Sequence, residues 1–444
     1  MPTTTTGPLT FGQLSQLRDA DSQPPEGRHQ VNVKRVTPLD TGVSAEALRH
    51  AAHRLRARHE GLRTTYDLHD PARLRQLVHP PGHPVPVDIP EIAVPAGEDP
   101  RAFADRLAEQ LQARLFDLAT EEPWRIAIVT VAGRPAYFVT VLHHIIADLW
   151  SDTVIAEDFQ ALLDDQEPRG PAGSPLQLAR AQHAANRQAD EAYQRQVYTR
   201  AAAASAFDAV ASPKVLVNAV LDTETAFLAA ARKAAAPGAS IPGLSMPSLT
   251  LAAYCYAAHR TLGVDNIMVS ALTSNRWYPG TARLVGNMVQ WARIPSRHIE
   301  GQPFEEFARQ LHENSLLGYR HACYDVDTDD RIRREVASTA GPIGLEINLN
   351  YAPIEPEPLT EDTPDGQVVD VPVPYYGGPA FYLIVNHGHR LRLIGRTRWV
   401  GFEHAAMSAF LTEIHDILVN GDSRPAHSAN PQLNRRIRPS RLSC

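Results

Sequence analysis

Two adjacent histidines followed by an aspartate are the residues best suited to chemistry in this 444-residue sequence. His143 and His144 stand at the end of an apolar segment, and Asp148 follows after three apolar residues. Neighbouring side chains of an extended segment point to opposite faces, so one ring should face the core and the other a cleft. Because imidazole titrates near neutral pH, a ring that faces a cleft can take a proton from an amine or hydroxyl that attacks a carbonyl. We expect Asp148 to hold the following turn by pairing with an arginine.

Other interpretations of the three residues stay open at this point. The paired rings can be structural or lie on the surface without chemistry. His143, His144 and Asp148 are also ligand types of a metal site, but adjacent histidines on a strand diverge, so we predict no metal. A serine hydrolase would need a G-x-S-x-G nucleophile elbow, and the sequence contains none.

Periodic patterns predict the elements that must position these side chains. Apolar residues at helical spacing predict helices over 44–58, 103–118, 153–163, 248–262, 303–319 and 402–418. Apolar, β-branched or alternating segments predict strands over 124–131, 136–142, 266–272, 343–351, 381–385 and 391–398. Both halves mix helices with strands, which predicts an α/β chain of two similar-sized lobes.

A proline- and glycine-rich connector over 168–175 divides the chain. It predicts an N-terminal lobe over 1–172, which carries the histidine pair, and a C-terminal lobe over 173–420. Residues 353–374 are rich in Pro, Asp and Glu and predict a long loop. The final stretch, 421–444, lacks apolar periodicity and is expected to be a flexible tail.

Composition excludes several classes of protein. Acidic residues number 50 against 43 basic ones, so the net charge of −7 does not suit a binder of nucleic acid. The three cysteines are scattered without CxxC spacing, which argues against a zinc ribbon or a disulfide framework. Neither a signal peptide nor an apolar run long enough to cross a membrane is present, so we expect a soluble, cytoplasmic protein.

The histidine segment and several others in the same order resemble motifs of one known family. HHIIAD resembles the HHxxxD core of nonribosomal peptide synthetase condensation domains, whose superfamily includes chloramphenicol acetyltransferase. RHEGLRTTY resembles RHExLRTxF, and four shorter segments resemble further motifs of the family. In chain order, the six segments are 9–13, 58–66, 143–148, 269–276, 285–289 and 348–352.

The resemblance implies both a fold and a reaction. The fold is two chloramphenicol-acetyltransferase-like lobes that form a V-shaped pseudo-dimer with a central tunnel. His144 is the implied catalytic residue, which deprotonates or orients the acceptor and helps to stabilise the tetrahedral centre. His143 packs inside its lobe, and Asp148 pairs with Arg276 as structural support of the site. The chain would form an amide or ester in natural-product biosynthesis, including that of antibiotics.

The resemblance also implies partners. The acyl or aminoacyl group arrives as a thioester on the phosphopantetheine arm of a carrier protein, the acceptor is a small amine or alcohol, and no cofactor is bound. Since the sequence shows no carrier or nucleotide-binding motif, we expect a free-standing monomer that meets its carrier in trans. Arginine clusters over 54–58 and 331–334 are candidate docking sites for an acidic carrier.

Departures from the family pattern bear on the substrates. Leu149 replaces the glycine that usually follows the motif aspartate, and Ser15 replaces an arginine. Residues 290–291 replace Asn-Thr, and 322–327 replace QDxPFE. The residues expected to line the tunnel or contact substrate are Leu149, Trp150, Gln290 and Asn350. Leu149 and the altered segment 322–327 leave open a non-catalytic recruitment module that binds a carrier protein or tailoring enzyme. An acyltransferase that uses acyl-CoA is a second alternative.

Overall fold

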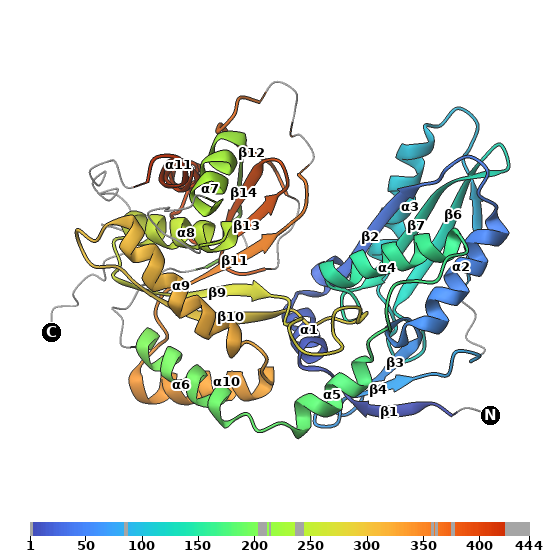
Figure 1. Cartoon of the computed structure of the whole chain (residues 1–444), viewed down its shortest axis with the longest axis horizontal. Helices are drawn as coiled ribbons and strands as arrows, with labels where there is room; N and C mark the ends of the chain where they lie inside the picture. The colour runs from blue at the N-terminus through green and yellow to red at the C-terminus, as the bar shows by residue number, and fades with distance from the viewer. Residues whose placement is uncertain are drawn as a thin grey trace. The chain divides into compact units, whose positions relative to one another are not determined.

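Two α/β units make up the computed structural model of this chain (Figure 1). The structure describes residues 3–83, 88–202, 211–212, 215–235, 244–356, 359, 363–373 and 378–421. Unit 1 comprises Met1–Asn186 and Ser274–Gln290, and unit 2 comprises Arg187–Thr273 and Trp291–Cys444. The predicted division at residue 172 therefore differs from this grouping in two places. Residues 173–186 belong to unit 1, and so does a later segment that a single cut cannot assign.

Unit 1 contains two sheets. The four-stranded sheet has the order β2-β7-β6-β5, in which β7 pairs antiparallel with both β2 and β6, and β5 runs parallel to β6. Its strands are β2 (Asn32–Pro38), β5 (Glu91–Ala93), β6 (Trp124–Val131) and β7 (Arg134–His143). A three-stranded antiparallel sheet has the order β1-β4-β3, with strands β1 (Thr5–Pro8), β3 (Thr64–Asp67) and β4 (Arg75–Val78).

Side-chain hydrogen bonds at the N-terminus fix the first residue of two helices of unit 1. Ser44 accepts a hydrogen bond from the Ala47 N–H at the start of α2, and Asp148 accepts one from Ser151 at the start of α4. Because the Asp148 cap starts α4 at Leu149, that helix begins four residues before the predicted position. The helices are α1 (Phe11–Ser22), α2 (Ala45–Arg58), α3 (Pro100–Ala113), α4 (Leu149–Leu163) and α5 (Pro175–Ala184), with short turns η1 (Pro25–Val31) and η2 (Glu60–Arg63).

Unit 2 is built on one seven-stranded sheet with the order β10-β9-β11-β13-β14-β8-β12. The strands are β8 (Val217–Thr223), β9 (Asn266–Thr273), β10 (Gln290–Arg297), β11 (Glu346–Ala352), β12 (Val368–Asp370), β13 (Phe381–His387) and β14 (Leu391–Thr397). The helices are α6 (Gln188–Ala202), α7 (Glu224–Ala235), α8 (Met246–Leu262), α9 (Phe304–Arg320), α10 (Val326–Ala340) and α11 (His404–Asn420).

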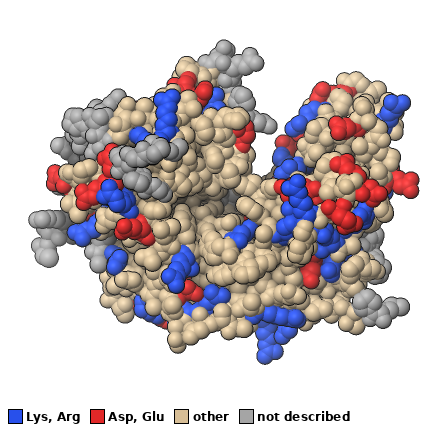
Figure 2. All heavy atoms as spheres, viewed as in Figure 1, with Lys and Arg blue, Asp and Glu red and all other residues tan. Residues whose placement is uncertain are grey.

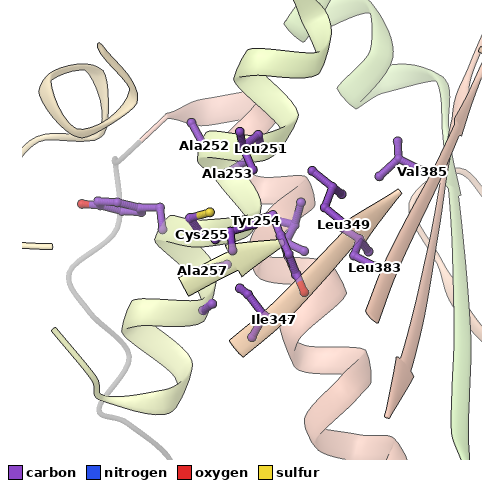
Figure 3. Close-up of a cluster of buried hydrophobic side chains, with 14 of the residues drawn as sticks. Leu251, Ala252, Ala253, Tyr254, Cys255, Ala257, Ile347, Leu349, Leu383 and Val385 are labelled. Carbon is purple, nitrogen blue, oxygen red and sulfur yellow. The ribbon is translucent and has the colours of Figure 1, made fainter. Parts of the chain in front are cut away.

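The core of unit 2 forms between α8 and the middle of this sheet (Figure 3). Small side chains such as Ala253 and Ala257 bring the α8 backbone close to Ile347 and Leu349 of β11. The buried Tyr254 hydroxyl donates to the Asn348 carbonyl at 3.0 Å, so its polar atom is satisfied. β11 runs parallel to both β9 and β13, and its alternating residues Ile347 and Leu349 belong to this core.

The predicted α/β class is confirmed, and most predicted elements exist within a few residues. The 381–398 hairpin forms as β13 and β14, paired antiparallel. The predicted helix over 103–118 is shorter than expected, since α3 ends at Ala113. Part of the predicted 353–374 loop forms β12, and the predicted tail beyond Gly421 lies outside the described residues.

Candidate active site

The histidine motif lies in the turn between β7 and α4 of unit 1. The His144 N–H donates to the Val31 carbonyl at 2.9 Å, and the Ile146 N–H donates to the His143 carbonyl at 3.1 Å. Ile145 and Ile146 are fully buried and anchor the turn in the core of unit 1. The apolar residues between His144 and Asp148 thus fix the backbone that presents both side chains.

His143 points into the interior of unit 1. Its Nδ1 accepts the Ile145 N–H at 3.0 Å, and its ring lies nearly perpendicular to the Phe116 ring, with 5.9 Å between the centroids. Burial, with smaller contributions from His144 and Arg125, lowers the pKa of His143 to about 3. His143 is therefore a neutral, packed ring.

His144 is half-buried and contacts an asparagine from the later segment of unit 1. The Asn287 Nδ2 atom lies 2.9 Å from His144 Nδ1 and 2.9 Å from the His144 carbonyl oxygen. Burial lowers the pKa of His144, while a hydrogen bond to its own backbone and the charge of Asp148 act in the opposite direction. The ring is consequently neutral near pH 7, as a group that accepts a proton from a substrate must be.

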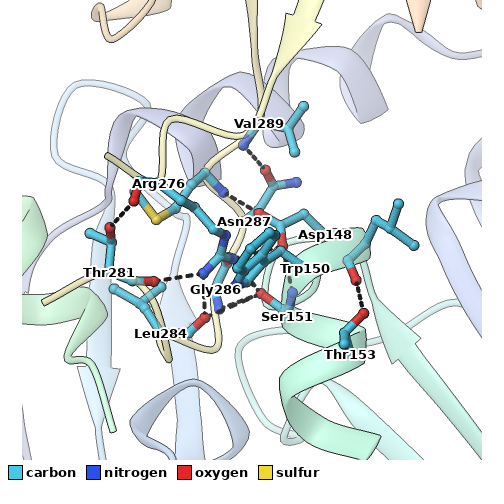
Figure 4. Close-up of polar contacts among 12 residues, drawn as sticks. Asp148, Trp150, Ser151, Thr153, Arg276, Thr281, Leu284, Gly286, Asn287 and Val289 are labelled. Atoms are coloured by element: carbon cyan, nitrogen blue, oxygen red, sulfur yellow. Dashed lines mark hydrogen bonds and ion pairs between the residues drawn. The ribbon is translucent and has the colours of Figure 1, made fainter. Parts of the chain in front are cut away.

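Asp148 and Arg276 form a buried ion pair with a distance of 2.7 Å between Oδ1 and Nη2 (Figure 4). The carboxylate also accepts the N–H groups of Ser151 and Met288, at 2.7 and 3.2 Å. Every described contact of Asp148 is thus to a group that holds the backbone in place, which fits structural support of the neighbouring His144.

Arg276 holds a loop of backbone carbonyls around itself. Its Nη1 donates to the carbonyls of Thr281 and Leu284 at 2.9 and 2.8 Å, and its Nη2 donates to the Gly286 carbonyl at 3.1 Å. Nη2 also donates to the Ser151 hydroxyl at 2.8 Å, which in turn donates to the Gly286 carbonyl at 2.9 Å. The guanidinium therefore ties segment 284–289 to the start of α4 (Figure 4).

Two residues of this network, Ser151 and Asn287, were not predicted from the sequence. Asn287 is 2% exposed and occupies the variable position of the segment that resembles VGxFV. A polar residue inside the apolar run 284–289 was the available signal, because a buried amide must find hydrogen-bond partners. Gly12 belongs to the same arrangement, since a Cβ there would lie 2.4 Å from the Asn287 carbonyl oxygen.

Comparison with family models decides which family this arrangement belongs to. The model described as "Condensation domain" matches residues 20–352, which include both histidines, Asp148, Arg276 and Asn287. The chain belongs to the condensation-domain family. Condensation domains are acyltransferases that form amide or ester bonds, act on substrates tethered to the phosphopantetheine arm of carrier proteins and need no cofactor.

Curated relatives match parts of this condensation domain. Nonribosomal peptide synthetase kk1B of Curvularia clavata is 35% identical over 137 residues, which are 30% of this chain and 1% of that protein. Tyrocidine synthase 3 of Brevibacillus parabrevis is 24% identical over 341 residues, which are 72% of this chain and 5% of that synthase. The chain thus spans only a small part of the length of these synthetases.

Solved condensation domains have the same fold. A structure titled "Molecular basis for condensation domain-mediated chain release from the enacyloxin polyketide synthase" has a TM-score of 0.74 and 21% identity, and the match covers 96% of this chain and 84% of that one. The starter condensation domain of rhizomide synthetase RzmA has a TM-score of 0.68 and 18% identity, and the match covers 95% of this chain and 99% of that one. The predicted pair of chloramphenicol-acetyltransferase-like lobes is the fold of this family.

The RHExLRTxF-like segment of this condensation domain is part of its framework. His59 Nε2 lies 2.8 Å from Asp158 Oδ2, Arg58 Nε lies 2.9 Å from the same oxygen, and Arg283 also pairs with this carboxylate. Burial alone would raise the pKa of Asp158, but these hydrogen bonds outweigh it and lower the pKa to about 2. The segment therefore joins the end of α2 to α4 through one carboxylate.

The predicted substrate contacts of the condensation domain are spread over both units. Leu149 and Trp150 open α4 with 41% and 51% of their side chains exposed, and the Trp150 indole donates to the Ala282 carbonyl at 2.8 Å. Gln290 is buried at the start of β10 in unit 1, whereas Asn350 is half-buried on β11 of unit 2. Their contacts with substrate remain predictions.

Most of the arginines proposed as docking sites form ion pairs. Arg56 is buried and bound to Glu122, and Arg54 pairs with the carboxylates of residues 165 and 167. In the second cluster, Arg331 pairs with Glu335 and Arg333 with Glu346. Figure 2 shows basic and acidic atoms interspersed on the face it presents. Neither cluster therefore offers a set of unpaired cations to an acidic carrier.

Two further features of the described residues concern metal sites and membrane-spanning helices. No three His, Cys, Asp or Glu side chains in the described part of the chain come together as a metal site would need. Among the same residues, no helix is both long and apolar enough to traverse a lipid bilayer. Cys255 and Cys323 are buried in unit 2, and burial raises the pKa of the Cys255 thiol.

Proposed function

We propose that this condensation domain joins a carrier-bound acyl or aminoacyl thioester to a small amine or hydroxyl acceptor, with His144 as the catalytic residue. The observation that supports this most directly is the neutral, half-buried His144 ring, anchored at Nδ1 by Asn287 and backed by the Asp148–Arg276 pair. His144 deprotonates or orients the acceptor and helps to stabilise the tetrahedral centre. A positioned acid–base group contributes roughly 10²–10⁴-fold to such a reaction.

The reaction balances without a cofactor. The acceptor nitrogen or oxygen attacks the thioester carbonyl carbon, and the carbonyl oxygen gains negative charge in the tetrahedral intermediate. Collapse of that intermediate breaks the C–S bond, and the thiolate of the phosphopantetheine arm takes the proton that the acceptor loses. The products are an amide or ester and a free thiol on the carrier.

The direct test is a survey of donors and acceptors. Carrier proteins loaded with different acyl and aminoacyl groups are mixed with a pool of amines and alcohols, and products are identified by mass spectrometry. We expect an acceptor-dependent product with the parent protein and little or none with His144→Ala. A parallel arm with free acyl-CoA separates carrier dependence from CoA-dependent acyl transfer. No product with any donor, together with tight binding of a loaded carrier, would instead support a recruitment module.

Leu149 is the feature that favours this recruitment alternative. Its partly exposed side chain stands at the first helical position after Asp148, where the family pattern has glycine. A bulky side chain there can restrict the acceptor next to His144, which would tune acceptor size or prevent turnover. Turnover by the parent protein decides between these two roles.

A further inference from the structure

A cavity of about 600 Å³ lies within unit 2, lined by residues of α6, α9 and the neighbouring strands β9 and β10 (Figure 1). Its volume falls in the range of roughly 300–1,000 Å³ that is typical of small-molecule pockets. Asn314 on α9 donates to the Pro295 carbonyl at 3.0 Å, which ties this helix to the edge strand β10. His144 belongs to unit 1 and does not line this cavity.

The buried residues of the cavity wall are apolar, with one exception. The apolar ones are Val197, Ala201, Ile267, Met268 and Leu345. The exception is Ser296, whose hydroxyl lies 2.8 Å from His259 Nε2 and is therefore already hydrogen-bonded. Removing apolar surface from water is favourable, so this part of the cavity suits an apolar group of a ligand.

The exposed residues of the cavity wall are polar, and two of them are cationic. They are Asn266, Gln310, Arg200 and Arg297. Within the described part of the chain, no aspartate or glutamate lines the cavity. Gln310 Oε1 accepts the Gln302 amide at 3.3 Å, which leaves the Nε2 hydrogens of Gln310 for another acceptor. The exposed side of the cavity therefore combines positive charge with N–H donors.

The two arginines are not neutralised by carboxylates of the protein. Arg195, on the same helix as Arg200, pairs with Glu335 at 2.7 Å. By contrast, neither Arg200 nor Arg297 has a carboxylate partner among the residues that the structure describes. A guanidinium binds a carboxylate or phosphate through several N–H groups at once, which makes these the anions it recognises best.

We propose that this cavity binds a small amphipathic anion, with an apolar tail against the buried wall and a carboxylate or phosphate head against Arg200 and Arg297. This is a second binding site, which the proposed reaction at His144 does not require. The two arginines select against neutral molecules with the same tail. The apolar wall selects against small inorganic anions, which have no tail to bury.

Isothermal titration calorimetry of the full chain tests the site with two probes that share a tail, octanoate and octyl phosphate. We expect at least one of them to bind, and their relative affinities show whether a carboxylate or a phosphate is the preferred head. 1-Octanol lacks the charge, and acetate and inorganic phosphate lack the tail, so these three should bind at least about tenfold more weakly. No binding of either probe, or equal binding of 1-octanol, would overturn the proposal.

Variants locate the bound anion. The double variant Arg200→Met and Arg297→Met should weaken binding by about tenfold or more, because hydrogen bonds to charged groups are among the strongest. Arg309→Met is the matched control, since Arg309 is an exposed arginine of α9 that does not line the cavity. Parent-like affinity of the double variant would refute the site.

His144→Ala separates this site from the candidate active site. We expect it to bind the probes like the parent protein, because His144 is not part of the cavity. Loss of binding in His144→Ala would place the anion at the candidate active site and contradict the proposal. The titrations use no donor or acceptor, so their outcome does not depend on the proposed acyl transfer.

Discussion

The Nη2 atom of Arg276 lies 2.7 Å from Oδ1 of Asp148, and both side chains are almost completely shielded from solvent. The two residues are far apart in the sequence, yet they join the later segment of unit 1 to the start of α4. Removing one partner of such a pair leaves an uncompensated buried charge, which typically costs about 3–5 kcal/mol.

Arg276→Met should therefore lower the free energy of unfolding by about 3–5 kcal/mol. Chemical denaturation with urea measures this change. The matched control is Arg101→Met, which breaks an exposed pair with Asp105 on α3 and should change stability by less than about 0.5 kcal/mol. Equal effects of the two substitutions would show that the buried pair does not hold the site together.

His143 should make the protein less stable in acid. Its pKa is 6.5 when unfolded and about 3 when folded, so the unfolded state binds the additional proton between these values. Its contribution to stability is complete above pH 6.5 and is lost as pH falls toward 3, by up to about 1.4 kcal/mol per pH unit. His143→Asn should reduce the pH dependence of the unfolding free energy by that amount between pH 6 and 4, as measured by denaturant titration at each pH. An unchanged slope would place His143 outside the buried core.

Gly12→Ala should harm the site by overpacking. The new Cβ would lie 2.4 Å from the Asn287 carbonyl oxygen and 2.7 Å from the Met288 Cα, so the backbone that carries Asn287 must shift. We expect the unfolding free energy to fall by about 1–3 kcal/mol. We also expect the condensation rate to fall, because Asn287 contacts His144. Gly82→Ala is the control, because nothing lies within 4 Å of a Cβ there. Parent-like activity of Gly12→Ala would show that the position of Asn287 is not critical.

Leu149→Gly should increase turnover of bulky acceptors. The Leu149 side chain is 41% exposed, and the Asp148 cap that starts α4 does not depend on it. We therefore expect stability to fall by no more than about 1 kcal/mol, while the rate with large amines rises relative to small ones. Leu149→Met, which keeps the side-chain volume, should behave like the parent protein. A size preference that does not change would exclude Leu149 from the acceptor path.

The strands and helices around the site were predictable because their patterns are local. Two apolar, β-branched segments separated by a short turn predict the β6–β7 hairpin. A serine directly before an apolar helical pattern predicts the Ser44 cap of α2. The early start of α4 was missed because the three residues before Thr153 carry no strong apolar period. Only the capping bond from Ser151 to Asp148 shows where the helix begins.

The assembly of the site was less predictable, because it depends on contacts between distant segments. His143, His144 and Asp148 stand together in the sequence, and the family resemblance implied the partner Arg276. Nothing local in the sequence indicates that Asn287 contacts His144. That contact exists because the later segment Ser274–Gln290 belongs to unit 1, which local patterns do not show. The tunnel implied between the lobes remains a prediction.

The most direct test of the proposed function is the single-turnover rate of acyl transfer from a loaded carrier to an acceptor, compared between the parent and His144→Ala. The control is His53→Ala, which removes an exposed histidine on α2. We predict that His144→Ala slows the transfer by about 10²–10⁴-fold, with a smaller remaining rate due to the positioning of the two substrates. His53→Ala should react like the parent protein. A folded His144→Ala variant that transfers the acyl group at the parent rate would contradict the assignment of His144 as the catalytic residue.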